Sequence, residues 1–381
     1  MTVDRILPTD EARALLELTR ELAAEEVTPK ADAAEASSEF PRELFRLLGR
    51  SGLLGLPYAE DHGGGAQPYE VYLQVLEELA SAWLAVGLGV SVHTLSCFPL
   101  AQFGSAEQRE RWLPEMVGGD KLGAYCLSEP DSGSDAAALS TKAVRDGDDY
   151  VVNGTKAWIT HAGEADFYSV MVRTTDDGPH GISCLLVPAG TAGLSVAPPE
   201  HKMGMRASTT AQVRLEGAHV PAERLIGEEG QGFTIALAAL DSGRLGIAAC
   251  SVGLAQAALD TAIDWAKERH QFGRAIIDFQ GLGFLLADMA TQVETGRAAY
   301  LAAARRRDAG LPFSKQAAMA KLYCSDMAMK VTTDAVQVLG GYGYVSDFPA
   351  ERYMREAKVL QIVEGTNQIQ RLVIARHLAR D

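Results

Sequence analysis

Two changes of residue pattern, near Asp120 and near Gly232, constrain the fold of this chain most strongly. Before the first change, apolar residues recur at helical spacing in the segments 12–25, 42–51, 70–85 and 106–116. After the second change, helical spacing returns and persists through the Ala-rich segments 281–307 and 314–339. Between the changes lie short β-rich runs. This order predicts an α+β protein with an N-terminal α-helical domain (1–120), a central antiparallel β-barrel or sandwich (121–230) and a C-terminal four-helix bundle (231–381).

The strands predicted for the central domain are short and closely spaced. They cover the segments 141–145, 150–152, 156–160, 167–174, 182–187 and 211–215. The pairs Asp146-Gly147, Asn153-Gly154 and Asp177-Gly178 separate some of them, and such pairs are typical of chain reversals. Frequent reversals favour antiparallel pairing.

Composition excludes several classes of function. The net charge of −15 argues against nucleic acid or an anionic membrane surface as a partner. There is no run of 18 apolar residues, so we expect no membrane span. The N-terminus lacks the apolar core of a signal peptide, and the 5 scattered cysteines favour a reducing cytoplasm. The 8 histidines form no metal-binding pattern, so we expect no metal. The sequence has no P-loop and no GxGxxG after a strand, so any nucleotide is held in another way.

Glu364 is the candidate catalytic residue. It ends a short, mostly apolar run from Leu360 to Val363 and is followed by Gly365, and Thr366 can cap the helix predicted next. Burial beside apolar side chains would raise the pKa of this carboxylate towards neutrality, and such a group can take a proton from carbon. Local sequence alone leaves open a surface glutamate at a helix entry.

Polar and aromatic residues suggest a site for a flat polar ligand. The loop from Cys126 to Ala138 is rich in Ser, Gly and Asp, which expose N–H groups and hydroxyls. Soon afterwards, Trp158 lies close to Thr160 at the end of a predicted strand. This pair could cover a ring and donate one hydrogen bond to its edge. The alternatives are a plain surface loop and a core tryptophan.

With these motifs, the chain resembles the acyl-CoA dehydrogenase family from about Leu15 to Arg376. The resemblance is carried by the blocks 127–135, 337–358 and 363–370. The order of helices, barrel and bundle in that family matches the order predicted above.

The resemblance implies that FAD lies between the β domain and the C-terminal bundle. Contacts from the same chain would come from Leu127, Ser128, Gly133, Ser134, Trp158, Ile159, Thr160, Thr366 and Gln368. Contacts from a neighbouring subunit would come from Arg269, Gln271, Phe272, Gln337, Gly340 and Gly341. The acyl-CoA would be bound by Ser134, Asp241, Arg244 and Gly365. Glu364 would be the catalytic base.

The activity implied is FAD-dependent α,β-dehydrogenation of a short- or medium-chain acyl-CoA to the trans-2-enoyl-CoA. The backbone N–H of Glu364 and a ribityl hydroxyl of the flavin would stabilise the thioester oxygen. Electrons would pass to an electron-transferring flavoprotein, and the assembly would be a homotetramer built as a dimer of dimers. One alternative is the same chemistry on an acyl group held by a carrier protein. Another is an inactive acyl-CoA-binding relative, against which the presence of Glu364, Trp158 and Arg269 weighs. Direct oxidation by oxygen is a lesser alternative.

Departures from the family pattern refine the expected substrate. Gly87 stands where glutaryl-type members carry an arginine, which disfavours a second carboxylate on the acyl chain. Gly243 stands where some branched-chain members carry the base, which leaves that role to Glu364. Val363 replaces the usual tyrosine before the base, so we expect more room near the thioester, which would admit a branched acyl group.

Overall fold

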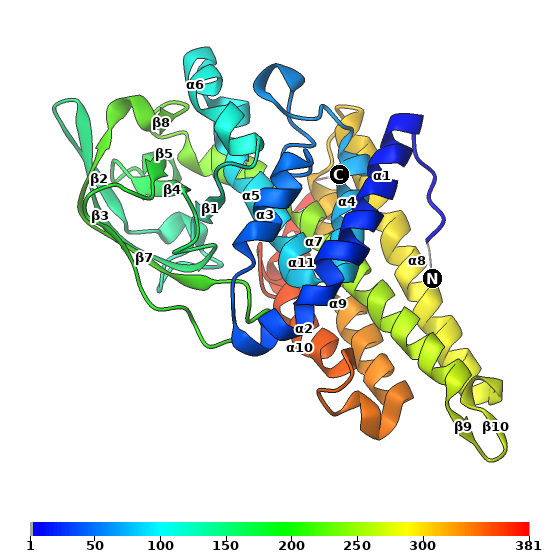
Figure 1. Ribbon diagram of the computed structural model, residues 1–381. Helices are drawn as coiled ribbons and strands as arrows, with labels where there is room; N and C mark the ends of the chain where they lie inside the picture. Colours follow the sequence, from blue (N-terminus) through cyan, green and yellow to red (C-terminus); the bar gives the residue numbers. More distant parts are fainter. Residues whose placement is uncertain (1–2, 381) are drawn as a thin grey trace.

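The computed structural model describes residues 3–380 and consists of a helical body with a β-sheet packed on one side (Figure 1). The helices before the sheet are α1 (Asp10–Leu22), α2 (Thr28–Ser37), α3 (Arg42–Arg50), α4 (Tyr69–Ala82), α5 (Leu84–Phe103) and α6 (Ala106–Val117). The helices after it are α7 (Gly232–Glu268), α8 (Gln280–Asp308), α9 (Ser314–Leu339), α10 (Ala350–Leu360) and α11 (Asn367–Leu378). The predicted fold class is confirmed.

One eight-stranded sheet forms the central part of the chain. Its strands are β1 (Gly123–Cys126), β2 (Lys142–Asp146), β3 (Asp149–Thr160), β4 (Phe167–Arg173), β5 (Ile182–Pro188), β6 (Leu194–Val196), β7 (Thr210–Pro221) and β8 (Leu225–Ile226). Most neighbours pair antiparallel, as predicted, but β1 pairs parallel with β4. Both faces of β4 are buried: Tyr168 and Val170 face the interior of the sheet, whereas Phe167 and Met171 face the helices.

The prediction of a turn at Asn153-Gly154 is wrong. The chain continues through both residues in the single strand β3, and the pairing with β7 shifts register between Val152 and Gly154. Gly154 has a φ of +154°, and a Cβ there would lie 2.7 Å from the Cα of Thr141. The glycine is therefore needed for close approach of two backbones at a bulge, a role that a local turn signal does not distinguish from a reversal.

Helix α5 was not predicted. Its sequence lacks helical periodicity because the helix is buried on all sides, from Leu84 to Leu100. A helix that is apolar all round gives no amphipathic signal. The preceding helix was predicted to run to residue 85 but ends at Ala82, because Trp83 adopts an extended conformation with a φ of −164°.

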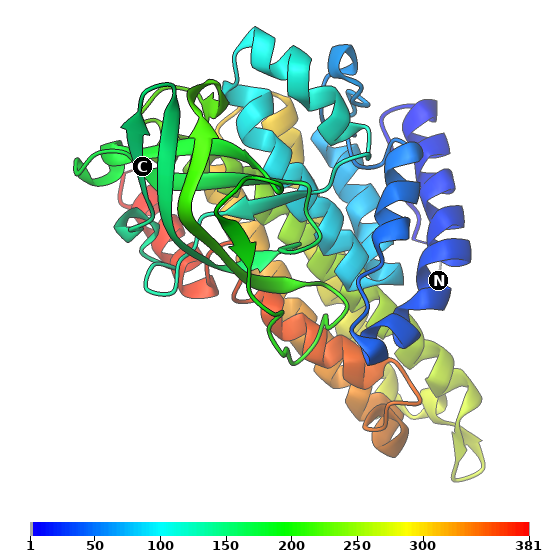
Figure 2. The same cartoon turned by 60° about the vertical axis from the view of Figure 1, so that its left-hand side comes forward.

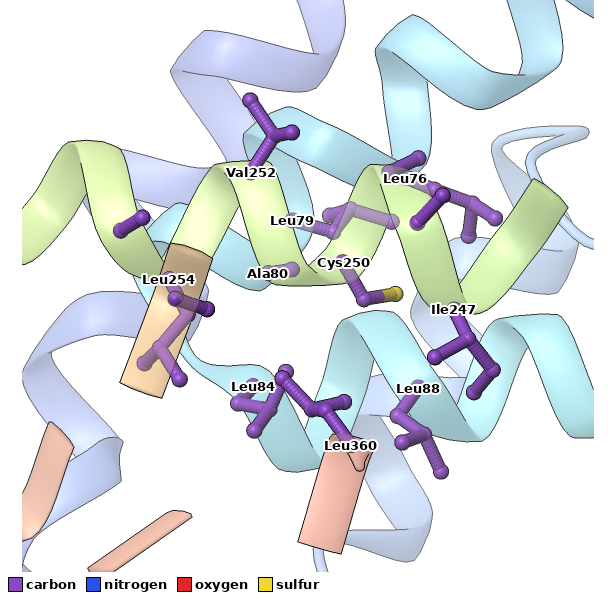
Figure 3. Close-up of a cluster of buried hydrophobic side chains, with 14 of the residues drawn as sticks. Leu76, Leu79, Ala80, Leu84, Leu88, Ile247, Cys250, Val252, Leu254 and Leu360 are labelled. Atoms are coloured by element: carbon purple, nitrogen blue, oxygen red, sulfur yellow. The ribbon is translucent and has the colours of Figure 1, made fainter. Parts of the chain in front are cut away.

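A single hydrophobic core joins the helices that precede the sheet in sequence to the helices that follow it. Helix α7 packs mainly against α9 and α4, and α8 packs against α7, α9 and α4. Figure 3 shows the centre of this core, where Leu76 and Leu79 of α4, Leu84 and Leu88 of α5 and Ile247 of α7 surround Cys250. The N-terminal helices therefore complete the packing of the C-terminal ones.

Two helices, α5 and α7, are long and apolar enough to cross a membrane by length and composition. Their most apolar windows are 89% and 78% buried inside the protein. Packing within the chain thus accounts for their apolar character.

A two-stranded hairpin, β9 (His270–Gln271) with β10 (Arg274–Ala275), follows α7. Figure 2 shows this hairpin at the end of the helical body away from the sheet. Any function of the hairpin is therefore separated from the sheet within one chain.

Candidate active site

Glu364 lies in a tight connection between α10 and α11. Both Glu364 and Gly365 have left-handed backbone conformations, with φ of +52° and +86°. The Nε2 of Gln370 donates hydrogen bonds to the backbone carbonyls of Gly365 (2.8 Å) and Glu364 (3.3 Å). Thr366 caps α11, as predicted, by accepting a hydrogen bond from the backbone N–H of Ile369. A non-glycine residue held in this conformation is strained, and such strain is common at functional sites.

The carboxylate of Glu364 is buried without compensation by hydrogen bonds. Both of its oxygens are inaccessible to solvent, and neither has a hydrogen-bond partner within residues 3–380. Burial raises the pKa of Glu364 to about 7, although the positive charges of Lys321 and Arg244 act in the opposite direction. The expected raised pKa is confirmed. A carboxylate with this pKa is partly ionised near neutral pH and can accept a proton.

Gly243 of α7 provides the space for this carboxylate. A Cβ on Gly243 would lie 2.8 Å from the Cδ of Glu364 and closer still to its Oε2. Gly243, which stands where some branched-chain members carry the base, is therefore needed for its lack of a side chain, because any side chain there would displace the carboxylate of Glu364.

Asp241 and Arg244 flank Gly243 on the same helix. The Nη1 of Arg244 donates to Oδ1 of Asp241 at 2.5 Å, and the hydroxyl of Ser314 donates to the same oxygen at 2.9 Å. Burial raises the pKa of Asp241. The Nε of Arg244 is buried and has no partner within the described residues, so it is free to bind a ligand. The structure thus brings Arg244 close to Glu364 and holds Asp241 against Arg244.

The sheet reaches the same site through Tyr125 of β1. Its hydroxyl is buried without a partner among the residues described. Burial raises the pKa of Tyr125, and the charges of Cys184 and Glu364 add to this effect. The predicted site therefore lies where β1, α7 and the α10–α11 connection meet.

A small cavity of about 10 Å³ adjoins Gly243. It is lined by Pro57, Tyr58, Tyr69, Ser91, Thr94, Leu95, Phe98, Ser242, Gly243 and Arg307. Val363 is not among these residues and packs against the helical core instead.

The reason given by Gly87 against a second carboxylate on the acyl chain is wrong, because residue 87 does not face the cavity. A Cβ on Gly87 would lie 2.7 Å from the backbone nitrogen of Ala80, so this position faces α4 and not the cavity. A cation does line the cavity, but it comes from α8, since the guanidinium of Arg307 lies 3.7 Å from the centre of the Tyr69 ring.

The predicted ring-covering residues lie at an irregularity of β3. The pairing of β3 with β7 shifts register between Lys156 and Ile159. Trp158, in this bulge, has a φ of +62° and leaves 64% of its surface exposed. Thr160 ends the strand beside it, whereas Ile159 is buried in the core of the sheet. Ile159 could therefore contact a ligand only through its backbone.

The polar loop after β1 lies against the same strand. The backbone N–H of Ala157 donates to the carbonyl of Ser128 at 2.9 Å, which fixes this loop next to Trp158. Gly133 and Ser134 are exposed further along the loop, whereas Leu127 is buried. At the start of α11, Thr366 is half-buried and Gln368 is exposed.

A buried ion pair, missed in the sequence, braces this arrangement. The Nζ of Lys156 donates to Oε1 of Glu129 (2.8 Å) and to the carbonyl of Leu127 (3.1 Å). Glu129 also accepts hydrogen bonds from the backbone of Ser140 and Thr141. Burial alone would raise the pKa of Glu129, but Lys156 and these hydrogen bonds lower it to about 2. The sequence did contain a signal for it: inward-facing and outward-facing residues alternate along β3, and this alternation places Lys156 at a position that faces inward.

The remaining predicted residues form a second site at the far end of α7. Arg269 ends that helix, Gln271 and the 93% exposed Phe272 follow in the hairpin, and Gln337 is exposed near the end of α9. A cavity of about 440 Å³ is lined by Trp265, Arg269, Gln271, Ile276, Val338, Leu339, Gly340, Gly341, Tyr342 and Val345. Gly243 and Arg269 are about 39 Å apart along the helix, at a rise of about 1.5 Å per residue. The structure therefore does not bring this set to Glu364 within one chain.

No group of three or more His, Cys, Asp or Glu side chains within residues 3–380 is arranged to hold a metal ion.

Comparisons with known proteins agree with this architecture. The sequence matches the family profiles described as the N-terminal domain (residues 9–120), the middle domain (124–218) and the C-terminal domain (230–379) of acyl-CoA dehydrogenase. It is 44% identical to an acyl-CoA dehydrogenase of Bacillus subtilis over 372 residues, which covers 97% of this chain and 98% of the relative.

Solved structures show the same similarity. Butyryl-CoA dehydrogenase from Megasphaera elsdenii superposes with a TM-score of 0.96 at 39% identity, covering 99% of this chain and 100% of that chain. A chain in the structure described as "Electron transferring flavoprotein of Acidaminococcus fermentans: Towards a mechanism of flavin-based electron bifurcation" superposes with a TM-score of 0.97 at 42% identity, and both chains are covered completely.

Proposed function

The chain belongs to the acyl-CoA dehydrogenase family of oxidoreductases, and we propose that it uses FAD to dehydrogenate a short-chain acyl-CoA between its α- and β-carbons. The observation that carries this proposal is the buried, unpartnered carboxylate of Glu364 beside Gly243 and a small cavity. A buried carboxylate without hydrogen bonds is costly to maintain, so a catalytic role explains it better than a structural one.

The residues of the chain fit FAD. The exposed indole of Trp158 offers a flat apolar surface, Ser128 and Thr160 lie close to it in the chain fold, and the exposed Ser134 offers a hydroxyl further along the loop. The open cavity at Arg269 offers a positive charge and the exposed backbone of Gly340 and Gly341. FAD, when bound, supplies the acceptor for the hydride that leaves the β-carbon.

The chain itself supplies the base and part of the oxyanion stabilisation. Glu364 takes the α-proton, and the electron pair of that C–H bond forms the new double bond as the hydride leaves. We propose that the backbone N–H of Glu364 donates to the thioester oxygen, on which negative charge develops. One preorganised donor of this kind is typically worth about 3 kcal/mol. The buried surroundings exclude water and strengthen that hydrogen bond.

The aromatic walls of the cavity support a short acyl chain. Tyr58, Tyr69 and Phe98 leave a volume of only about 10 Å³, room for at most about one water molecule, so an acyl group must displace these walls and a short chain displaces them least. Butyryl-CoA dehydrogenase among the similar structures agrees with this choice. Val363 does not line the cavity, so we do not extend the proposal to a branched substrate.

The separation of the two predicted flavin sites supports an assembly in which each flavin contacts two chains. Because Arg269 lies about 39 Å along α7 from Gly243, it can contact the flavin beside Glu364 only from a partner subunit. We propose a homotetramer built as a dimer of dimers. An electron-transferring flavoprotein is the proposed electron acceptor, since a similar chain occurs in the structure from Acidaminococcus fermentans. The 5 free, buried cysteines suit the cytoplasm that we propose as its location.

The test of the reaction is anaerobic bleaching of the purified protein. We expect a yellow protein whose flavin absorbance falls on addition of butyryl-CoA, falls less with longer chains, and does not fall with butyryl groups on a carrier protein. A colourless protein that takes up no FAD refutes the proposal, and bleaching by the carrier-bound substrate alone changes the substrate class.

The test of the shared flavin site is complementation. Glu364→Gln lacks the base but offers an intact Arg269, and Arg269→Ala has the base but lacks the clamp, so each variant alone should be nearly inactive. With random pairing about half of the dimers are mixed, and one of the two sites in each mixed dimer combines both intact residues. Roughly a quarter of all sites are then intact, and activity should recover to about that fraction. No recovery in dimers shown to be mixed would mean that Arg269 serves the flavin of its own chain.

A further inference from the structure

Lys321 is a fully buried cation in the middle of α9. Its Nζ donates hydrogen bonds to the backbone carbonyl of Gly365 at 3.0 Å and to Oδ1 of Asn367 at 2.8 Å. Both acceptors belong to the connection that carries Glu364 and to the first turn of α11. Lys321 is therefore fixed directly beneath the catalytic turn.

Both acceptors of the hydrogen bonds from Lys321 are uncharged oxygens, so these bonds compensate only part of the cost of burying an ammonium group. Asn367 is held in turn by Ser325 and Asp326, since its Nδ2 donates to the hydroxyl of Ser325 (2.9 Å) and to Oδ1 of Asp326 (2.7 Å). The charge of Lys321 and the unpartnered carboxylate of Glu364 thus share one buried region of α9, α7 and the α10–α11 connection.

The pKa values of the two groups reflect this proximity. Burial lowers the pKa of Lys321 to about 8, while the negative charges of Glu364 and Asp326 act to raise it. Lys321 in turn opposes the effect of burial on Glu364. The titratable and charged groups that face this pair are Tyr69 of α4, Tyr125 of β1, Arg244 and Cys250 of α7, and Asp326 of α9; Asp241 is paired with Arg244.

We propose that Lys321 is a positioning residue for the dehydrogenation: it holds the strained catalytic turn through the carbonyl of Gly365, and its charge favours the ionised form of Glu364 that accepts the α-proton. The inference rests on the proposed function. It adds a role for a side chain that does not touch the substrate.

A structural role and a charge role predict different behaviour. If Lys321 only joins α9 to the turn, a neutral donor can replace it, and the pH dependence of the base stays the same. If its charge acts on Glu364, any neutral replacement raises the pH at which the base is ionised. An opposite charge nearby typically lowers the pKa of a carboxylate by about 1 unit or more, so its removal should shift the titration by at least about 1 pH unit.

The experiment measures the pH profile of single-turnover bleaching by butyryl-CoA in the FAD-loaded protein. Lys321→Gln keeps a hydrogen-bond donor but loses the charge, Lys321→Met loses both, and Lys321→Arg keeps both. Lys330→Met is the matched control, because Lys330 lies on the same helix, is 57% exposed and pairs only with Asp334 in the described structure. Flavin content and melting temperature report whether each variant is folded.

The ionisation limb is the part of the pH profile in which the rate rises as Glu364 loses its proton. In Lys321→Gln we expect this limb to lie about 1 pH unit higher than in wild type. Lys321→Met should show the same shift and, in addition, a lower rate at high pH because the turn has lost its hydrogen bond. Lys321→Arg and Lys330→Met should keep the wild-type limb.

An unchanged limb in a folded, flavin-loaded Lys321→Gln overturns the charge role, and a wild-type plateau rate in Lys321→Met overturns the positioning role. If Lys321→Gln and Lys321→Met do not fold whereas Lys321→Arg does, the lysine is required for folding and the inference fails. Failure of wild type and Lys330→Met to bleach with any acyl thioester instead refutes the proposed function. The two failures are therefore distinguishable.

Discussion

Replacing Gly243 by alanine should uncouple activity from stability. A Cβ at this position would lie 2.8 Å from the Cδ of Glu364. Carbon atoms in favourable contact are about 3.5–4.0 Å apart, so the carboxylate must move by about 1 Å. A displacement of that size at the reacting centre can reduce the rate about 100-fold, or about 2.7 kcal/mol in activation free energy.

The fold should tolerate the same substitution. Gly243 lies inside α7, where alanine is favoured over glycine by up to about 1 kcal/mol. The atoms that the new Cβ meets belong to the end of the Glu364 side chain and not to backbone, so the clash is relieved by moving that side chain. We therefore expect flavin content and melting temperature close to those of wild type.

The assay is anaerobic stopped-flow bleaching with butyryl-CoA at a pH above 8, where Glu364 is ionised. Gly281→Ala is the matched control, since a Cβ there, in the first turn of α8, meets no atom within 4 Å. A Gly243→Ala protein that bleaches within about threefold of the wild-type rate would show that Glu364 does not react from the position described here. A loss of flavin or of stability equal to the loss of rate would refute the packing argument.

Other substitutions test separate parts of the site. Glu364→Gln should keep its flavin but lose several orders of magnitude in bleaching rate, because an amide cannot accept the proton. The pKa of Glu364 in the folded protein, about 7, is above its value in the unfolded chain, so the wild-type protein becomes less stable as the pH rises from the unfolded pKa to the folded pKa. Thermal melts should therefore show that the stability of Glu364→Gln relative to wild type increases between pH 5 and pH 8, by at most roughly 3 kcal/mol, and does not increase at pH 4. Lys156→Met should destabilise the protein by about 3–5 kcal/mol in denaturant titrations, because Glu129 is left buried and unpaired, and adding Glu129→Gln should restore part of the loss; no difference between the single and double variants would contradict the ion-pair argument. Phe98→Ala should enlarge the cavity and raise the ratio of kcat/KM for hexanoyl-CoA to that for butyryl-CoA, and an unchanged ratio would show that this cavity does not hold the acyl chain.

The sequence alone determined the order of the structural layers. Helical spacing and β-rich runs are local properties, so the three-part architecture and the bounds of α8, α9 and β4 could be predicted closely. The cap at Thr366 could also be predicted, because a capping residue and the helix it caps are neighbours in sequence. The apolar run before Glu364 was consistent with burial of its carboxylate but left a surface position open.

Elements shaped by their surroundings could not be predicted in this way. Helix α5 has no amphipathic pattern because other helices surround it, and the Asn153-Gly154 pair forms a bulge because Thr141 of a neighbouring segment approaches the backbone. In both cases the deciding contact comes from a part of the chain that is distant in sequence.

The same reason explains what was missed in the site. Glu364 and the residues 127–160 could be selected from their own motifs, but the space provided by Gly243, the buried Lys321 beneath the turn and the pairing of Lys156 with Glu129 each join residues far apart in the chain. Sequence specifies which side chains are available for chemistry. Which of them share one desolvated volume, and therefore shift one another's pKa, is decided by how α7, α9 and the sheet pack together.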